Sequence, residues 1–252
     1  MPTAITRQVS PRFCDCELTH LERIPINLEI ARAQHNDYTQ ALEKLNCHII
    51  ELPAEPDLPD SVFVEDTAVI LPEAALVTRP GAQSRRGEIK DIAATLRPYR
   101  ELIYVREPAT VDGGDVLVIG HEIFVGLSTR SGLEAVIQMQ EALGWFGYRV
   151  TGLPLYDCLH LKSAVTALGP DAVLINPCWV ETGPFAKYER VEIFPAEPFA
   201  ANILMIGDSG IYPTAFPETQ RILEKRGVPL ITVDVSEIAK AEGAVTCCSL
   251  IL

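Results

Sequence analysis

Two neighbouring thiols, one imidazole and several carboxylates are the groups in this sequence best suited to catalysis. The thiols are Cys247 and Cys248, and the imidazole is His160, which lies between two leucines and precedes a lysine. Asp112 and Asp115 flank a pair of glycines. A thiolate nucleophile that works with a proton donor on a cationic substrate uses this set of groups. Because the residues lie far apart in the sequence, only the fold could bring them together.

Each of these residues also has an ordinary structural interpretation. A cysteine on an apolar strand is more often a packing residue than a nucleophile. A lone histidine between leucines is usually a hydrogen-bonded core residue, and an aspartate before two glycines is often a turn residue. The residue types alone therefore leave both a catalytic and a structural role open.

The composition excludes several other classes of protein. A net charge of −13 argues against nucleic acid or an anionic membrane as a partner. No run of about 18 apolar residues is present, and the first residues lack the apolar segment of a secretory signal. The seven cysteines include no Cys-x-x-Cys pair, which favours free thiols in a reducing compartment over disulfides or a zinc site. We therefore expect a cytoplasmic protein that binds a small molecule.

The elements that must position these residues repeat along the chain. Four units are predicted on one pattern of two strands, a helix and a further strand, and the first two units show it in full. The predicted strands span 62–70, 75–79, 102–106, 115–119, 122–127, 148–153, 161–167, 172–176, 191–194, 202–206 and 230–235, and the predicted helices span 84–96, 131–143 and 217–225. The third unit has only a weak helix, because Gly183-Pro184 interrupts it. The fourth unit has a turn over 207–210 where a second strand would be expected.

The two ends of the chain can share a fifth unit. Residues 245–252 are predicted to form its first strand, and the N-terminal region supplies a strand over 3–9, an amphipathic helix over 28–45 and a strand over 47–52. Such sharing closes a ring, and closure removes exposed sheet edges. The units start about 41 to 53 residues apart, close to the spacing of ring-like repeats. We therefore predict one α/β domain over residues 1–252 arranged as a five-unit ring, with an open α/β sheet as the alternative.

A ring of this kind has a consequence for the reactive residues. Equivalent positions of all units lie at the same end of the central axis. The residues at these positions are Glu65 and Asp66, Asp112 and Asp115, His160, Asn202 and Cys247. The ring therefore gathers them at one opening, whereas an open sheet need not.

Several segments resemble dimethylarginine dimethylaminohydrolase, a family of the guanidine-modifying superfamily. The matching segments are residues 58–66, 78–86, 112–116, 124–130, 159–163, 200–202 and 246–249, which occur in order over nearly the whole chain. The first two are specific to this family, and the Gly-Gly-Asp and His-Leu-Lys segments are shared more widely. The resemblance implies a five-bladed α/β propeller (pentein) of ββαβ units. It also implies hydrolysis of Nω-methylated L-arginine to L-citrulline and methylamine or dimethylamine, without a cofactor or metal.

The resemblance also assigns the catalytic groups. Cys247 would be the nucleophile that forms a covalent thiouronium intermediate, and Cys248 would be buried. Alternation along a strand would place the two thiols on opposite faces. His160 would protonate the departing amine and then activate water. Asp112 is counted with these catalytic residues, although some relatives carry glutamate at its position.

The remaining assignments concern substrate binding. Asp66 would clamp the guanidinium together with Asp112, with Glu65 assisting, because carboxylates accept bidentate hydrogen bonds from a planar cation. The residues expected to bind the amino-acid head are Arg85 and Arg130 at the α-carboxylate, and Asp60 and the backbone carbonyl of Ala241 at the α-ammonium. Leu18 would belong to a mobile lid, although residues 11–27 match the family poorly.

Three other functions stay open at this point. An arginine deiminase uses the same groups on unmethylated arginine, but those enzymes are usually longer and carry an inserted helical region. An amidinotransferase would use an amine in place of water. A catalytically silent propeller would only bind arginine-like ligands. The sequence does not fix the preference among methylated arginines or the oligomeric state, for which a homodimer is one option.

Overall fold

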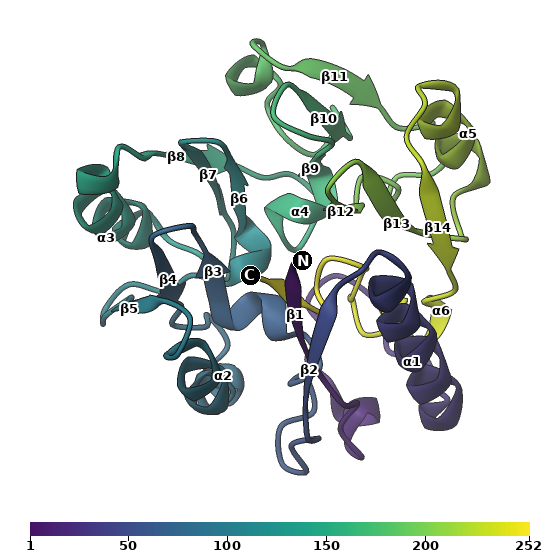
Figure 1. Ribbon diagram of the computed structural model, residues 1–252, viewed down its shortest axis with the longest axis horizontal. Helices are drawn as coiled ribbons and strands as arrows, with labels where there is room; N and C mark the ends of the chain where they lie inside the picture. The colour runs from purple at the N-terminus through teal and green to yellow at the C-terminus, as the bar shows by residue number, and fades with distance from the viewer.

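Five three-stranded sheets surround a central axis, with the helices on the outside of the ring (Figure 1). The structure is a computed structural model that describes all residues, 1–252. Going round the ring, the sheets are β3 (Ala68–Ile70), β4 (Ala74–Val77) and β5 (Glu101–Tyr104); β6 (Val116–Ile119), β7 (Glu122–Leu127) and β8 (Arg149–Pro154); β9 (Val165–Ala167), β10 (Ala172–Ile175) and β11 (Glu189–Glu192); β12 (Leu204–Ile206), β13 (Ser209–Pro213) and β14 (Leu230–Val233); and β15 (Leu250–Ile251), β1 (Thr3–Arg7) and β2 (His48–Leu52).

Every sheet has the same mixed topology. Its middle strand pairs antiparallel with the preceding strand and parallel with the following one. A parallel pair cannot be joined by a tight turn, so each unit needs a crossover connection. The crossover helices are α1 (Leu28–Lys44), α2 (Ile89–Leu96), α3 (Leu133–Leu143) and α5 (Pro217–Lys225). In the third unit a single 3₁₀ turn, η6 (Gly183–Phe185), stands in for the helix, as the Gly-Pro interruption predicts.

The ring closes through the pairing of the two ends of the chain. β1 pairs with β15, with Ala4 opposite Ile251, and the backbone of Thr3 and Leu252 exchanges two further hydrogen bonds. Figure 1 shows both termini at the centre of the ring. The predicted five-bladed propeller is therefore confirmed, and the open-sheet alternative is excluded.

The strand β13 is absent from the sequence-based prediction. Its residues begin in the predicted turn over 207–210 and end at a proline, which favours a loop assignment. The structure places Gly207 at a φ of 60°, so that a tight turn joins β12 to β13. Ile211 and Tyr212 are fully buried, and their burial stabilises the strand.

The predicted strands also extend too far at their inner ends. The inner end of four blades is a short helical or turn segment, and the strand begins only after it. These segments are η2 (Val64–Thr67), η4 (Gly113–Asp115), α4 (Leu161–Ala164) and the turn over 245–248. Successive side chains on a helical turn spread around its axis instead of alternating between two faces. The inner ends therefore direct several neighbouring polar side chains toward the centre of the ring.

The apolar core is divided among the contacts between neighbouring blades. One cluster joins the first two blades through residues such as Leu76, Val125 and Met139. The largest cluster packs α1, through Tyr38 and Leu42, against the fourth and fifth blades. All seven cysteines are free. No helix of the chain has the length and apolar character needed to cross a bilayer.

Candidate active site

A narrow pocket of about 20 Å³ lies where the inner ends of the blades meet. Seven of the predicted site residues line it: Asp60, Asp66, Arg85, Arg130, His160, Ala241 and Cys247. The ring therefore brings together residues as far apart in the sequence as Asp60 and Cys247. The other three predicted residues lie around this pocket without lining it.

The nucleophile candidate lies on a turn and not on a strand. The backbone N–H of Cys247 donates to the carbonyl of Ala244 at 3.2 Å, and the Cys247 carbonyl accepts the N–H of Glu65 at 3.1 Å. The prediction of a strand over 245–252 is therefore wrong for all but its last residues. The two thiols are nevertheless separated, because Cys248 is buried while Cys247 lines the pocket.

The environment of Cys247 disfavours its thiolate. Burial raises the pKa of the thiol well above its usual value, and the negative charges of Glu65 and Asp66 add to the increase. A cation placed in the pocket would oppose both of these carboxylate effects. A cationic ligand would therefore favour the thiolate form of Cys247.

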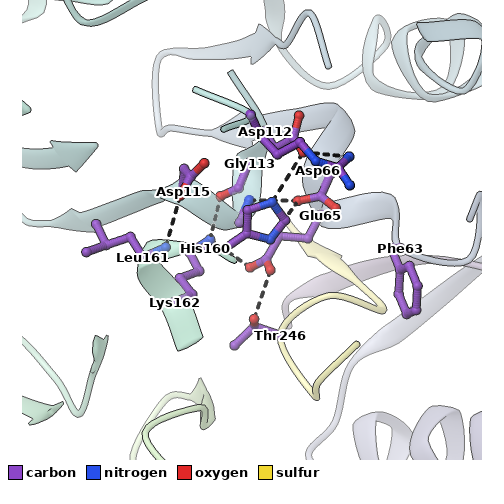
Figure 2. Close-up of polar contacts among 12 residues, drawn as sticks. Phe63, Glu65, Asp66, Asp112, Gly113, Asp115, His160, Leu161, Lys162 and Thr246 are labelled. Carbon is purple, nitrogen blue, oxygen red and sulfur yellow. Dashed lines mark hydrogen bonds and ion pairs between the residues drawn. The ribbon is translucent and has the colours of Figure 1, made fainter. Parts of the chain in front are cut away.

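His160 lies between two carboxylates (Figure 2). Its Nε2 is 3.2 Å from Oδ2 of Asp112, and its Nδ1 is 3.9 Å from Oδ1 of Asp66. Burial acts to lower the pKa of the imidazole, but the charges of Asp66, Asp115 and Asp112 outweigh it and raise the pKa to about 9. The imidazole therefore carries a proton at neutral pH. Gly114 makes this arrangement possible, because a Cβ there would lie 2.6 Å from Nδ1 of His160.

Asp66 is held by a cation and by a backbone donor. Its Oδ2 accepts from Nη1 of Arg85 at 2.6 Å, and its Oδ1 accepts from the N–H of Gly114 at 2.9 Å. Burial acts to raise the pKa of Asp66, but the charges of His160 and Arg85 lower it to about 2. Asp66 therefore presents a permanent negative charge to the pocket.

The two arginines differ in how far their donors are occupied. Arg85 bonds both Asp66 and Glu88, and its Nη2 also contacts the carbonyls of Asp60 and Phe63. Arg130 donates to the hydroxyl of a threonine at 3.0 Å, and its Nη1 is 3.8 Å from Asp112. Arg130 therefore has more free donors for a ligand than Arg85 has.

Asp112, Glu65 and Leu18 are the predicted residues outside the pocket. Asp112 lies behind His160, where its Oδ1 accepts the N–H of Gly81 at 2.8 Å. Leu18 packs against the apolar cluster of the fifth blade, and its neighbour Glu17 lines the pocket instead. Their predicted roles remain predictions.

Glu65 belongs to a polar belt to which every blade contributes. Its Oε1 accepts from Nζ of Lys162 at 2.7 Å, and its Oε2 accepts from the hydroxyl of Thr246 at 2.8 Å (Figure 2). Lys162 also donates to the carbonyl of Gly113 at 3.2 Å, while the side-chain amide of Asn202 bridges Thr246 and the carbonyl of Lys162. These five residues fix the inner ends of the blades relative to one another.

Glu242 is a residue of the site that the sequence does not reveal. Its carboxylate accepts the backbone N–H groups of Thr19, His20 and Leu21 at distances from 2.6 to 3.1 Å. This contact holds residues 19–21 against Glu242, which itself lines the pocket. No motif marks Glu242, because its partners lie more than 200 positions away and are backbone groups.

A second cavity of about 440 Å³ adjoins the pocket and shares Leu159, Glu242 and Gly243 with it. Its walls are mostly apolar and include neither Cys247 nor His160. The thiol, imidazole and carboxylates are all at the smaller pocket, so we place the candidate active site there.

Asp66, Asp112 and His160 lie close enough together to suggest a metal site, since one atom from each lies within 4.8 Å of the others. The carboxylate oxygens are already used by backbone N–H groups, by Arg85 and by the imidazole. The nearby cation of Arg85 would also repel a metal ion. The group therefore suits an organic cation and a proton donor better than a metal.

The arrangement can perform a nucleophilic substitution at a cationic carbon. Cys247 supplies the nucleophile, protonated His160 can transfer a proton to a leaving group, and Asp66 can hold a positive charge beside them. Arg130, which also lines the pocket, can bind an anionic group.

Comparisons with known proteins agree with this chemistry. A family described as N,N dimethylarginine dimethylhydrolase, eukaryotic, matches residues 19–181. The chain is 38% identical over 247 residues to the N(G),N(G)-dimethylarginine dimethylaminohydrolase of Streptomyces coelicolor, covering 98% of this chain and 95% of that protein. The Pseudomonas aeruginosa protein of the same name is 34% identical over 222 residues, which is 87% of each chain.

Solved structures show the same relationship. A variant of the Pseudomonas aeruginosa protein complexed with citrulline matches with a TM-score of 0.94 at 31% identity, covering 99% of this chain and 98% of that one. The N-terminal domain of the cyanobacterial arginine dihydrolase ArgZ matches with a TM-score of 0.89 at 19% identity, covering 99% and 97%, which shows a shared fold alone. Fold, site composition and sequence similarity thus agree, and the chain belongs to the dimethylarginine dimethylaminohydrolase family.

Proposed function

We propose that this protein hydrolyses Nω-methylated L-arginine to L-citrulline and methylamine or dimethylamine. The observation that carries the proposal is the convergence of Cys247, His160 and Asp66 on one pocket that Arg130 also lines. Membership of the family and the relative complexed with citrulline support the same product.

The first half of the reaction begins when the substrate guanidinium enters beside Asp66. Its positive charge offsets the carboxylates that raise the pKa of Cys247, so the thiol can lose its proton to solvent. The thiolate adds to the guanidinium carbon and forms a C–S bond. His160 donates its proton to the methylated nitrogen, the C–N bond breaks, and the free amine leaves a covalent thiouronium on Cys247.

The second half of the reaction removes the covalent bond. His160, now neutral, takes a proton from a water molecule, and the resulting hydroxide adds to the same carbon. The C–S bond then breaks, the sulfur leaves as a thiolate, and the added hydroxyl loses its proton to solvent, so that the carbon becomes the ureido group of citrulline. His160 is then protonated as it was at the start, and the thiolate takes up a proton from solvent to restore the thiol.

The amino-acid head of the substrate would be bound at the other side of the pocket. Arg130 has free donors for the α-carboxylate. Asp60 and the carbonyl of Ala241 would accept from the α-ammonium, although Asp60 also accepts the N–H of Glu17 at 3.1 and 3.3 Å. Burial raises the pKa of Asp60, and a bound ammonium would oppose that increase.

One set of assays tests the proposal. The protein is incubated separately with asymmetric dimethylarginine, monomethylarginine and arginine, and citrulline, dimethylamine, methylamine and ammonia are measured. We expect citrulline and the matching methylated amine in equal amounts from the methylated substrates, with Cys247→Ser as an inactive control. Citrulline and ammonia from arginine alone would assign the protein to deiminase chemistry instead.

A further inference from the structure

Asp115 is a buried carboxylate that no step of the proposed reaction uses. It lies in η4, it is fully buried, and it does not line the catalytic pocket. Burying an ionised carboxylate is unfavourable unless strong hydrogen bonds compensate for the loss of water. The hydrogen bonds of this group therefore indicate what it holds in place.

Three donors converge on the Asp115 carboxylate. Its Oδ2 accepts from the hydroxyls of Ser128 and Ser131, each at 2.6 Å. Its Oδ1 accepts from the backbone N–H of Leu161 at 3.0 Å (Figure 2). Hydroxyl–carboxylate distances of this length are typical of charge-assisted hydrogen bonds. The contacts therefore suit the ionised form of Asp115.

Each donor is linked in turn to a candidate site residue. The Ser131 hydroxyl oxygen accepts the backbone N–H of Asp112 at 3.0 Å, and that of Ser128 accepts the N–H of Arg130 at 3.0 Å. The third donor belongs to the residue that follows His160. One carboxylate thus connects the backbone at three site residues from two blades.

The surrounding chain leaves room for this carboxylate. A Cβ at Gly126 would lie 2.7 Å from Oδ1 of Asp115 and 3.0 Å from Cβ of Leu161. Contacts that short do not occur between real side chains, so only glycine fits at this position of β7. The missing side chain at Gly126 therefore leaves room for the Asp115 carboxylate and for its hydrogen bond to Leu161 of the following blade.

Asp115 also contributes to the charge around His160. Its negative charge is second only to that of Asp66 among the effects that raise the pKa of His160. Burial raises the pKa of Asp115 itself to about 6, although the charge of His160 and the two serine hydroxyls oppose the increase. Four other titratable groups face His160 or Asp115, namely Asp66, Asp112, Cys158 and Cys247. Arg85 pairs with Asp66, and Arg130 pairs with Asp112.

We propose that Asp115 is a positioning residue that fixes His160, Asp112 and Arg130 relative to one another and keeps a proton on the His160 imidazole. Its kinetic consequences rest on the proposed hydrolysis, whereas its effect on His160 does not. A purely structural carboxylate would affect folding stability without changing the titration of His160.

The decisive variant is Asp115→Asn, which keeps the size of the side chain and removes its charge. We expect kcat to fall about 10- to 100-fold, the range for partners that orient a catalytic group. We expect the alkaline limb of the kcat–pH profile to move about 1 pH unit lower, as for the loss of a nearby charge. The matched control is Asp157→Asn, which removes an exposed carboxylate three residues before His160 and should leave both quantities unchanged.

Ser131 provides a second variant that keeps the charge of Asp115. Ser131→Ala removes one donor from Asp115 and the acceptor of the Asp112 N–H. It should lower kcat about 10-fold, and Ser131→Thr should restore the rate because the hydroxyl is kept. If Asp115→Asn does not fold, Ser131→Ala and Ser131→Thr test the proposal instead. Equal kcat values for these two variants would overturn it.

A titration without substrate separates this proposal from the proposed function. The protein is labelled with ¹⁵N-histidine, the His160 signals are assigned with His160→Gln, and the imidazole is titrated by NMR. We expect the pKa of His160 to fall by about 1 unit in Asp115→Asn and to stay in place in Asp157→Asn. An unchanged titration in folded Asp115→Asn would overturn the proposal. A shifted titration in a protein that does not hydrolyse methylarginine would overturn the proposed function and support the role of Asp115.

Discussion

The two sides of the catalytic pocket balance their charges in different ways. On one side, Asp66, Asp112 and Asp115 surround the single imidazole of His160. On the other side, Arg85 is held by Asp66 and Glu88 through hydrogen bonds of 2.6 to 3.0 Å. Asp66 belongs to both sides. Carboxylates outnumber cations on both sides, but the cation of the first side is a titratable imidazole, whereas that of the second is a guanidinium with all of its nitrogens engaged.

This difference separates the chemical step from the framework that holds it. The pKa of His160 is about 9, so it can gain and lose a proton within an accessible pH range. Burial acts to lower the pKa of Arg85, but the charges of Glu88 and Asp66 raise it well above its usual value, so the guanidinium stays charged throughout. We infer that proton transfer belongs to the His160 side, and that the Arg85 side supplies fixed charge. The predictions below test this division, from the largest expected effect to the smallest.

Removal of the thiol between the two sides should have the largest effect. Cys247→Ser should lower kcat on the order of 10⁴–10⁶-fold, as expected for loss of a nucleophile. Substrate should still bind, because both sides of the pocket remain intact. Cys248→Ser should keep most of the activity, because that thiol is buried away from the pocket. Turnover assays measure kcat, and calorimetric titration measures substrate binding. An active Cys247→Ser variant would show that Cys247 is not the nucleophile.

The His160 side is tested by His160→Gln. This variant should lower kcat by roughly 10²–10⁴-fold, the usual contribution of a general acid–base group. An adduct should accumulate on Cys247, because hydrolysis of the intermediate needs the same base. Mass spectrometry of the intact protein during turnover detects the adduct. A wild-type rate in this variant would place proton transfer elsewhere.

The two arginines test the same division, because only Arg130 has N–H donors that are free to bind a ligand. Arg130→Ala should raise KM by an amount equivalent to about 1.5–3 kcal/mol, the contribution of hydrogen bonds to a charged group, with little loss of stability. Agmatine, which lacks the carboxylate, should be a poor substrate for the wild type. Comparison of kcat and KM for methylarginine and agmatine checks this. Equal use of both compounds would show that the site does not recognise a carboxylate.

Arg85→Ala should act on stability as well as on binding. It removes the cation that pairs with Glu88 and one of the two cations beside Asp66. Breaking a buried ion pair typically costs about 3–5 kcal/mol of folding free energy. Chemical denaturation of both arginine variants measures the difference. Equal stabilities for Arg85→Ala and Arg130→Ala would contradict the division between framework and ligand-binding groups.

The smallest effect concerns the pH dependence of stability. Folding raises the pKa of His160 from 6.5 to about 9, so its contribution is complete below pH 6.5 and is lost as the pH rises through 9. Folding lowers the pKa of Asp66 from 3.8 to about 2, so its contribution is present above pH 3.8 and is lost as the pH falls through 2. The difference in unfolding free energy between wild type and His160→Gln should therefore shrink between pH 6.5 and 9. A constant difference across that range would contradict the assignment.

Much of the ring could be predicted from sequence because each blade repeats a local apolar pattern. The exceptions are places where distant contacts decide the local structure. The apolar segment before β15 has a strand-like pattern, but Thr246 bonds Asn202 and Glu65, and these contacts hold the chain in a turn. The spacing of apolar residues along the sequence carries no information about hydrogen bonds to residues in other blades.

The site shows the same limit. Family resemblance located the residues that line the pocket, since seven of the predicted residues meet there. It did not indicate that Arg85 is paired on both sides or that Glu242 holds residues 19–21, because those facts depend on which groups meet after folding. Their identification required the three-dimensional arrangement.

The pairing of β1 with β15 also has a consequence for the order of folding. It joins Ala4 to Ile251, so it is among the most distant contacts in the chain, and contacts of this kind form late because closing a long loop costs entropy. Until they form, Cys247 has no fixed position relative to His160. During refolding from denaturant, most secondary structure should therefore return before activity does. In the interval the thiol should react with alkylating reagents as an ordinary exposed cysteine, and its reactivity should fall as the ring closes.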